Sequence, residues 1–379
     1  MNEGFLARDQ FQCLFDALLD QGYTLLGPTI QQEAIVYDSV AKVDQLPIGM
    51  VDIQEPGSYK LQQTESDHHF SWATAAQSLK PLCFAPNETL WQSSKASDGK
   101  ISFSDTLEEF NPIAVIGAKA CDLAALKLQD KHFLQQEYVD PYYQRRRKAL
   151  FIVSVDCNNP ASTCFCHSTG DGPSVDTSAL TVMDINLTEL DDGFIVLASS
   201  ERAVTILEAL PLSTLNKEQL EQKKQQHQIS IDKQTRSLPA CDISQTLKNR
   251  QEHTHWDDIG QRCLACGNCT AVCPSCFCHS ETDESALNSN QVSHTRQWDS
   301  CFNQNHSYIH GIIIRPESRS RYRQWMTHKF SSWYEQYGRS GCTGCGRCIS
   351  WCPVGIDVTQ ELEVICNEVE SNLGKKDND

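Results

Sequence analysis

Residues 263–274 read CLACGNCTAVCP, and residues 342–353 read CTGCGRCISWCP. Both stretches follow one pattern, C-x2-C-x2-C-x3-C-P. The proline after the fourth cysteine has a fixed φ and ends the pattern. So specific a spacing does not occur twice in one chain by coincidence. We therefore expect the two runs to bind the same kind of group.

Cysteines at this spacing are typical of the thiolates that hold [4Fe–4S] clusters in two-cluster ferredoxins. Three thiolates of one tight loop can bind one cluster, whereas the fourth binds the other cluster. The pattern therefore predicts two [4Fe–4S] clusters. One would be held by Cys263, Cys266, Cys269 and Cys352, and the other by Cys342, Cys345, Cys348 and Cys273.

Two alternatives to this pairing remain open at this point. Each run could close on its own cluster, without an exchange of the fourth cysteine. The runs could also be a pair of zinc knuckles, although zinc sites usually take their ligands as two spaced pairs. Four closely spaced cysteines followed by proline, found twice, favour the clusters.

Length, charge and cysteine content limit the class of protein. The chain has 379 residues, a formal net charge of −17 and 19 cysteines. This length suffices for two or three domains. An acidic chain lacks the basic footprint of nucleic-acid binding, and we find no apolar run of about 18 residues that could span a membrane. Because the N-terminus does not look like a secretory signal, we expect a cytoplasmic protein whose cysteines stay reduced and bind metal.

The pattern of apolar residues predicts an α+β protein. Strands are expected at residues 34–37, 113–117, 150–155 and 194–198, and helices at 5–22, 121–133, 201–210 and 216–233. Alternating strands and helices predict an N-terminal α/β domain over residues 1–240. A mainly helical, ferredoxin-like domain with two [4Fe–4S] clusters should follow over residues 250–370. The segment at about 279–341 separates the two runs and is expected as a long insertion in this domain.

Four cysteines of the predicted α/β domain form a further candidate metal site. Cys121 follows one predicted strand, and Cys157, Cys164 and Cys166 follow the next. Since the carboxyl ends of such strands meet along one sheet edge, the four thiols could hold a third iron–sulfur cluster, with His167 as an alternative ligand. The competing interpretation is a set of small buried residues, because free cysteine packs as a hydrophobic side chain.

The remaining cysteines carry weaker signals. Cys276, Cys278 and Cys301 could bind another metal together with His279, or could only pack around the clusters. Cys13, Cys83, Cys241 and Cys366 stand alone and are expected in the core. The basic stretch at 315–329 is a solvated face, a source of positive charge beside the clusters, or a docking surface. We find no dinucleotide-binding G-x-G-x-x-G after a strand and no P-loop.

Several motifs resemble one family of proteins. Residues 117–125 read GAKACDLAA, and Cys157 to Pro160 with residues 164–168, CFCHS, form a second match. Further matches are WDSC at 298–301, RSRYR at 319–323 and HKF at 328–330. Together they resemble the beta subunits of NAD(P)-linked sulfhydrogenases and the A subunits of anaerobic sulfite reductases.

This resemblance implies a non-catalytic subunit that transfers electrons. It would act between a flavoprotein subunit that uses NAD(P)H and a subunit with a catalytic metal centre. That centre is a nickel–iron hydrogenase in one branch and a sirohaem sulfite reductase in the other. The alternative function is an enzyme that reduces a sulfur compound at the Cys121, Cys157, Cys164 and Cys166 site.

Overall fold

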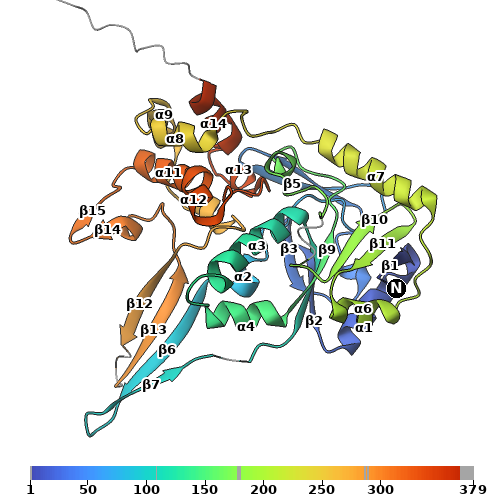
Figure 1. Ribbon diagram of the computed structural model, residues 1–379, viewed down its shortest axis with the longest axis horizontal. Coiled ribbons are helices and arrows are strands. Elements are labelled where there is room, and N and C mark those ends of the chain that lie inside the picture. The colour runs from blue at the N-terminus through green and yellow to red at the C-terminus, as the bar shows by residue number, and fades with distance from the viewer. Residues whose placement is uncertain (1, 108, 177–180, 286, 288–289, 368–379) are drawn as a thin grey trace, which may run out of the picture.

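The computed structural model describes residues 2–107, 109–176, 181–285, 287 and 290–367. A seven-stranded sheet lies in the N-terminal half, and the cysteine runs lie in a mainly helical part at the other side of the molecule (Figure 1). The chain thus has the α+β fold that the sequence predicts. Residues 368–370, at the end of the predicted second domain, lie outside the described residues, and the division into two domains remains a prediction.

The main sheet consists, in spatial order, of β1 (Glu3–Ala7), β11 (Gly193–Ala198), β10 (Ile185–Glu189), β9 (Leu150–Val155), β8 (Ile113–Ala118), β2 (Thr24–Gln31) and β3 (Ala34–Ser39). The central strands β10, β9, β8 and β2 run parallel. All six residues of β9 are buried. A strand that is buried on both faces reads as a continuous apolar run, which is why β8, β9 and β11 are evident in the sequence.

Helices cover both faces of this sheet: α1 (Gln12–Asp20) and α6 (Glu201–Glu208) on one face, and α2 (Lys80–Cys83), α3 (Ala120–Leu134) and α4 (Pro141–Ala149) on the other. Successive side chains of a strand point to opposite faces. Accordingly, Phe151 and Val153 of β9 pack with α1 and α6, whereas Leu150 and Ile152 pack with α3 and α4.

A second sheet joins distant parts of the chain. It consists of β12 (His279–Ser285), β13 (Gln291–Trp298), β6 (Asn87–Lys95) and β7 (Ile101–Asp105), all antiparallel. In Figure 1 it forms an arm that extends from the body of the molecule. Strands β6 and β13 come from opposite sides of the first cysteine run, so main-chain hydrogen bonds connect the N-terminal half to the segment between the runs.

Short helices surround the cysteine runs: α8 (Ile243–Asn249), α9 (His255–Arg262), α10 (Asn268–Ala271), α11 (Ser318–Thr327), α12 (Trp333–Tyr337), α13 (Arg347–Ser350) and α14 (Val358–Asn367). A π-helical turn at His328–Ser332 joins α11 to α12. Phe302, Tyr322 and Trp325, all from between the runs, belong to one apolar core with cysteines of both runs.

The remaining elements are a hairpin of β4 (Met50–Glu55) and β5 (Ser58–Gln63), the turn α5 (Cys166–Thr169), the long helix α7 (Lys217–Asp232) and a small hairpin of β14 (Tyr308–Ile309) and β15 (Ile312–Ile313). Helix α7 runs along the outside of the molecule, as its polar sequence predicts (Figure 1). Among the described residues, no helix combines the length and the apolar character that a membrane span requires.

Two expectations from the sequence are wrong. The helix expected at residues 5–22 begins only at Gln12, because Phe5 and Leu6 belong to β1 and pair with β11. Cys241 and Cys366 are not separate core residues in the reduced state, since they form a disulfide between two points 125 residues apart in the chain. Cys83, in contrast, is buried in the core as predicted.

Candidate iron–sulfur centres

The first cysteine run forms a loop that leads into α10. Its first three thiols, Cys263, Cys266 and Cys269, line one cavity together with Cys348 and Cys352 of the second run. Cys263 interacts most strongly with Cys352 and Cys266 among the neighbouring thiols. The other walls are largely apolar and include Phe302, Tyr322 and Trp325.

The second run lines another cavity. Cys342, Cys345 and Cys348 face this cavity, and Cys273, the last cysteine of the first run, lines it as well. Because Cys348 and Trp325 line both cavities, the two cavities adjoin. Each cavity therefore contains three cysteines of one run and at least one of the other.

The two loops share an unusual backbone conformation. Ala265 and Gly344 occupy the same place in the pattern and have φ angles of 52° and 64°. The N–H of Ala265 donates to Sγ of Cys263 at 3.4 Å, and the N–H of Gly344 donates to Sγ of Cys342 at 3.4 Å. Hydrogen bonds to coordinating sulfur stabilise its negative charge and raise the reduction potential of a bound cluster.

The cysteines of the two runs differ in burial: Cys342 and Cys345 are buried, Cys266 is exposed and the others are half-buried. Burial raises the pKa of Cys342 to about 12 and raises the pKa of Cys269 well above its usual value. Thiolates at these positions therefore need compensating positive charge, which iron ions provide when they bind. Four thiols around a small apolar space are the donor set of a [4Fe–4S] cluster, so the residues present fit that group.

A buried lysine lies beside the second cavity. Lys329, in the π-helical turn, is 4% exposed, and its Nζ lies 3.4 Å from Sγ of Cys273 and 3.1 Å from Oγ of Ser275. Burial alone would lower the pKa of Lys329, but the thiols of Cys273 and Cys276 outweigh burial and raise it. The amino group of Lys329 thus lies in the wall of this cavity, next to a proposed cluster ligand.

The N-terminal half forms part of the second cavity. Phe165 lines it, and the N–H of Phe165 donates to the carbonyl of Gly344 at 2.8 Å. The Arg347 side chain is fully buried and forms a bidentate pair with Asp122 at 2.7 and 3.0 Å. Such pairs are costly to break, because removal of one partner leaves a buried charge.

The four candidate cysteines of the N-terminal half, Cys121, Cys157, Cys164 and Cys166, are all buried, but each has different neighbouring thiols. Cys164 interacts with Cys166 and Cys157. Cys121 packs with Cys166 and with Cys345 of the second run. The group is therefore next to the second cavity. His167 is exposed, and its backbone N–H is bound to Gln234.

A second buried lysine accompanies this group. Lys119 is 1% exposed, donates to the carbonyl of Phe70 at 3.2 Å and lies 4.3 Å from the ring centre of Trp72. Among the described residues, no carboxylate forms an ion pair with it. Its positive charge lowers the pKa of Cys157, whereas burial, the larger effect, raises it.

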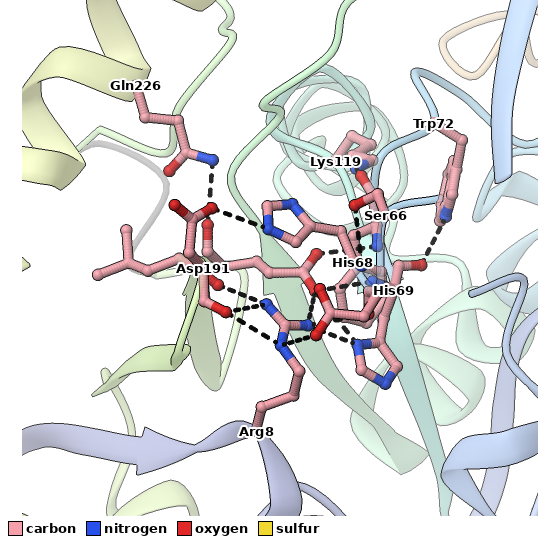
Figure 2. Close-up of polar contacts among 12 residues, drawn as sticks. Arg8, Ser66, His68, His69, Trp72, Lys119, Asp191 and Gln226 are labelled. Carbon is pink, nitrogen blue, oxygen red and sulfur yellow. Dashed lines mark hydrogen bonds and ion pairs between the residues drawn. The ribbon is translucent and has the colours of Figure 1, made fainter. Parts of the chain in front are cut away.

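The segment that contacts Lys119 is held by the polar network shown in Figure 2. Buried Glu189 accepts hydrogen bonds from Arg8 at 2.7 Å, from the N–H of His69 at 2.7 Å and from the N–H of Phe70 at 2.9 Å. Burial would raise the pKa of Glu189, but the hydrogen bonds from His69 and Arg8 outweigh it and lower the pKa. The sequence contains no motif that predicts this network, so the roles of Glu189, Arg8 and His69 were not predicted from the sequence.

Two of the remaining cysteine candidates, Cys276 and Cys278, line one cavity together with Lys80 and Asp299. Cys301 packs against the apolar core that contains Phe302 and Tyr322. His306, which no motif marks, has its Nδ1 3.0 Å from Oδ2 of Asp299. His279 lies elsewhere, with Nδ1 3.1 Å from the carbonyl of Phe277.

The basic stretch at 315–329 is largely neutralised by its neighbours. Arg319 pairs with Glu252 and Asp257, and Arg323 pairs with Glu252. Arg321 is buried and donates to backbone carbonyls. Its last residue, Lys329, lies against the thiol of Cys273.

Comparison with known proteins identifies the family. Residues 262–356 match the model of a 4Fe-4S dicluster domain. The chain is 30% identical over 256 residues to sulfhydrogenase 2 subunit beta of Pyrococcus furiosus, an alignment that covers 66% of this chain and 73% of that protein. The chain therefore belongs to the family of sulfhydrogenase beta subunits and is an iron–sulfur subunit that relays electrons.

Proposed function

We propose that this chain is a fixed relay in a larger oxidoreductase. Electrons pass through it between a flavoprotein subunit that uses NAD(P)H and a subunit with a catalytic metal centre. The curated relative is a sulfhydrogenase subunit, which favours a nickel–iron hydrogenase over a sirohaem sulfite reductase as the catalytic partner. The chain itself supplies no substrate chemistry in this role.

The two adjoining thiol cavities carry this proposal. Cys263, Cys266, Cys269 and Cys352 would hold one [4Fe–4S] cluster, and Cys342, Cys345, Cys348 and Cys273 the other. When bound, each cluster takes up and releases one electron. The protein contributes the apolar walls that exclude water, the N–H groups of Ala265 and Gly344 that bind sulfur, and the amino group of Lys329.

The metal content of anaerobically purified protein tests the proposal. Two clusters require about eight iron and eight sulfide atoms per chain. Cys345→Ser should damage one cluster, slow electron transfer between the partner subunits and leave the partner's own active site intact. Cys83→Ser, a buried cysteine outside both cavities, is the matched control. Iron below about eight atoms per wild-type chain would contradict the proposal.

We further propose a third cluster at Cys121, Cys157, Cys164 and Cys166. Four buried thiols from two segments of the chain support it, together with the buried charge of Lys119. Its position beside Cys345 would extend the path of electrons from the second run into the N-terminal half. Wild-type protein should then contain at least about twelve iron atoms, and Cys164→Ser should remove about four, whereas Cys83→Ser removes none.

One observation favours a second candidate function, the reduction of a sulfur compound. A cavity of about 450 Å³ adjoins the third group, and its lining includes His167, Lys131 and Arg339. Gly172 also lines it, and a Cβ at Gly172 would lie 2.8 Å from Sγ of Cys166. If the isolated chain reduces sulfite or polysulfide with an artificial electron donor, and Cys166→Ser abolishes this activity, the enzyme function is favoured over the relay.

A further inference from the structure

One side of helix α11 is buried and reaches both thiol cavities. Its buried residues recur at the spacing of one helical face: Arg321, Tyr322, Trp325 and Met326. The Arg321 guanidinium donates hydrogen bonds to the carbonyl of Arg315 at 2.8 Å and to that of Phe302 at 3.1 Å. Phe302 and Tyr322 are walls of the first cavity. These bonds therefore fix the position of α11 against that cavity.

Trp325 lies where the two cavities adjoin. It lines the first cavity together with Tyr322 and the second together with Lys329. The ring centre of Trp325 lies 5.2 Å from that of Tyr322 and 6.2 Å from that of Phe302. The side chain is buried, with 4% of the residue exposed. Packing thus holds the indole between the two candidate cluster sites.

The indole N–H of Trp325 is buried without an acceptor. Among the described residues, no protein atom accepts a hydrogen bond from its Nε1. A buried N–H of this kind loses its hydrogen bonds to water and gains none in return, which is costly for the folded state. The acceptor is therefore expected from the group that fills the adjoining cavities.

Other indoles of the chain find an acceptor in the protein. Nε1 of Trp72, of Trp256 and of Trp298 donates to a backbone carbonyl at 3.3, 2.9 and 3.2 Å, respectively. Trp333 of α12 shares the feature of Trp325, since its buried Nε1 also lacks an acceptor among the described residues. Trp333, however, lines neither of the two thiol cavities. It therefore provides a matched control for Trp325.

The residue one turn after Trp325 indicates which acceptor to expect. Nζ of Lys329 lies 3.4 Å from Sγ of Cys273, a proposed ligand of the second cluster. It also lies 3.1 Å from Oγ of Ser275 and 3.3 Å from the carbonyl of Gly341, so one of its three acceptors is sulfur. This part of the chain thus places two side chains with N–H donors in the walls of the cavities.

A bound [4Fe–4S] cluster offers such an acceptor through its sulfide and cysteine sulfurs. These sulfurs become more negative when the cluster takes up an electron, so a hydrogen bond to them favours the reduced form and raises the reduction potential. An indole N–H donates and does not accept. It can therefore bind sulfur in both oxidation states of the cluster, and more strongly in the reduced one.

We propose that the indole N–H of Trp325 donates a hydrogen bond to a sulfur of one of the two clusters and raises its reduction potential relative to the other. This inference rests on the proposed relay. It goes beyond that proposal because it assigns part of the potential difference between the clusters to a residue outside both cysteine runs. Since electrons pass toward the cluster of higher potential, Trp325 helps to set the direction of transfer within the chain.

Redox titration of the anaerobically purified full chain, followed by EPR spectroscopy, tests the proposal. Trp325→Phe removes the N–H and keeps an aromatic ring. The equilibrium constant for reduction of one cluster should fall about fivefold to tenfold, or about 40–60 mV at 59 mV per tenfold change. The potential of the other cluster should not change. Trp333→Phe should leave both potentials at their wild-type values. Wild-type potentials in Trp325→Phe, or the same shift in both variants, would overturn the proposal.

A measurement on the wild-type sequence keeps the test decisive if Trp325→Phe does not retain its clusters. In protein labelled with ¹⁵N at the indole nitrogens, pulsed EPR of the reduced clusters should show a ¹⁵N hyperfine coupling. Trp333→Phe should retain this coupling, and its absence from the labelled wild type would refute the hydrogen bond.

The iron content separates this inference from the relay itself. Fewer than about eight iron atoms per wild-type chain would contradict both. A full complement of iron without the coupling and without the shift would contradict only the role of Trp325.

Discussion

The two cysteine runs have the same spacing but different surroundings. In the first run Cys266 is exposed, whereas in the second run Cys342 and Cys345 are buried. The position of Asn268, which is exposed, is occupied in the second run by Arg347, which is fully buried. One spacing can thus serve an outer site, accessible to a partner, and an inner site that is built into the α/β half of the molecule.

The largest expected effect comes from the residue that brings the inner loop against the N-terminal half. A Cβ at Gly344 would lie 2.6 Å from the backbone of Cys166 and of Phe165, which cannot move aside like a flexible side chain. Gly344→Ala should therefore destabilise the protein by about 4 kcal/mol or more and remove iron from the inner site. Iron analysis and thermal unfolding measure this.

Gly99→Ala is the control for this substitution. Gly99 also has a positive φ, of 87°, but a Cβ there would meet no atom within 4 Å. An equal loss of stability in both variants would show that conformational strain alone, and not the contact between the halves, accounts for the effect.

The second prediction compares Arg347 with Asn268. Arg347→Met leaves Asp122 buried without its partner, so we expect a loss of about 3–5 kcal/mol in the free energy of unfolding. Asn268→Ala removes one exposed hydrogen bond, to the carbonyl of Trp351 at 3.2 Å, and should cost about 1 kcal/mol or less. Denaturant unfolding of the two variants under anaerobic conditions measures the difference. If both variants lost a similar amount of unfolding free energy, the two runs would be equally tolerant of substitution at this position.

The third prediction concerns pH and the support of the inner site. Since the pKa of Glu189 is lowered in the folded chain, its carboxylate stabilises the fold above about pH 4.3, the usual pKa of glutamate. This contribution is lost as the pH falls through the lowered pKa. Glu189→Gln should therefore be less stable than wild type by about 1–3 kcal/mol at pH 7, and the difference should shrink at pH 3–4.

Urea unfolding of both chains at each pH measures this difference, in which the acid loss of clusters from either chain largely cancels. Glu208→Gln, an exposed residue of α6, controls for the change in net charge. A stability difference that does not depend on pH would show that the Glu189 carboxylate does not act through its charge.

The smallest expected effect is at the outer counterpart of Gly344. Ala265 has a φ of 52°, which costs an L-amino acid about 1–2 kcal/mol, whereas glycine there loses about 0.5–1 kcal/mol of conformational entropy. Ala265→Gly should therefore stabilise the protein slightly, by about 0.5 kcal/mol, without changing its iron content. A loss of iron in this variant would mean that the outer loop is as constrained as the inner one.

Local sequence patterns predict much of the fold. Strands β8, β9 and β11 are continuous apolar runs because both of their faces are buried. The cysteine spacing is equally local, since three thiols of one loop face one cavity. Phe5 and Leu6 misled the prediction because their spacing continues the apolar pattern of α1, although pairing with β11 places them in a strand.

The features that escaped prediction depend on residues far apart in the chain. Strand β12 is polar and exposed, and the sheet around it is held by pairing of β13 with β6, some 200 residues away, so no local apolar signal marks it. The disulfide of Cys241 and Cys366 has no diagnostic spacing. Lys80, Lys119 and Lys329 look like ordinary surface lysines until the fold buries them.

The hydrogen bond between Phe165 and Gly344 has a consequence for biosynthesis. The segment around Cys164 is translated about 180 residues before the second run and is held on a sheet whose central strands are complete by residue 189. The early half of the chain can therefore fold first and present a finished surface to the late half. A truncated chain that begins near residue 250 would lack that template, although it contains all eight cysteines of the two runs.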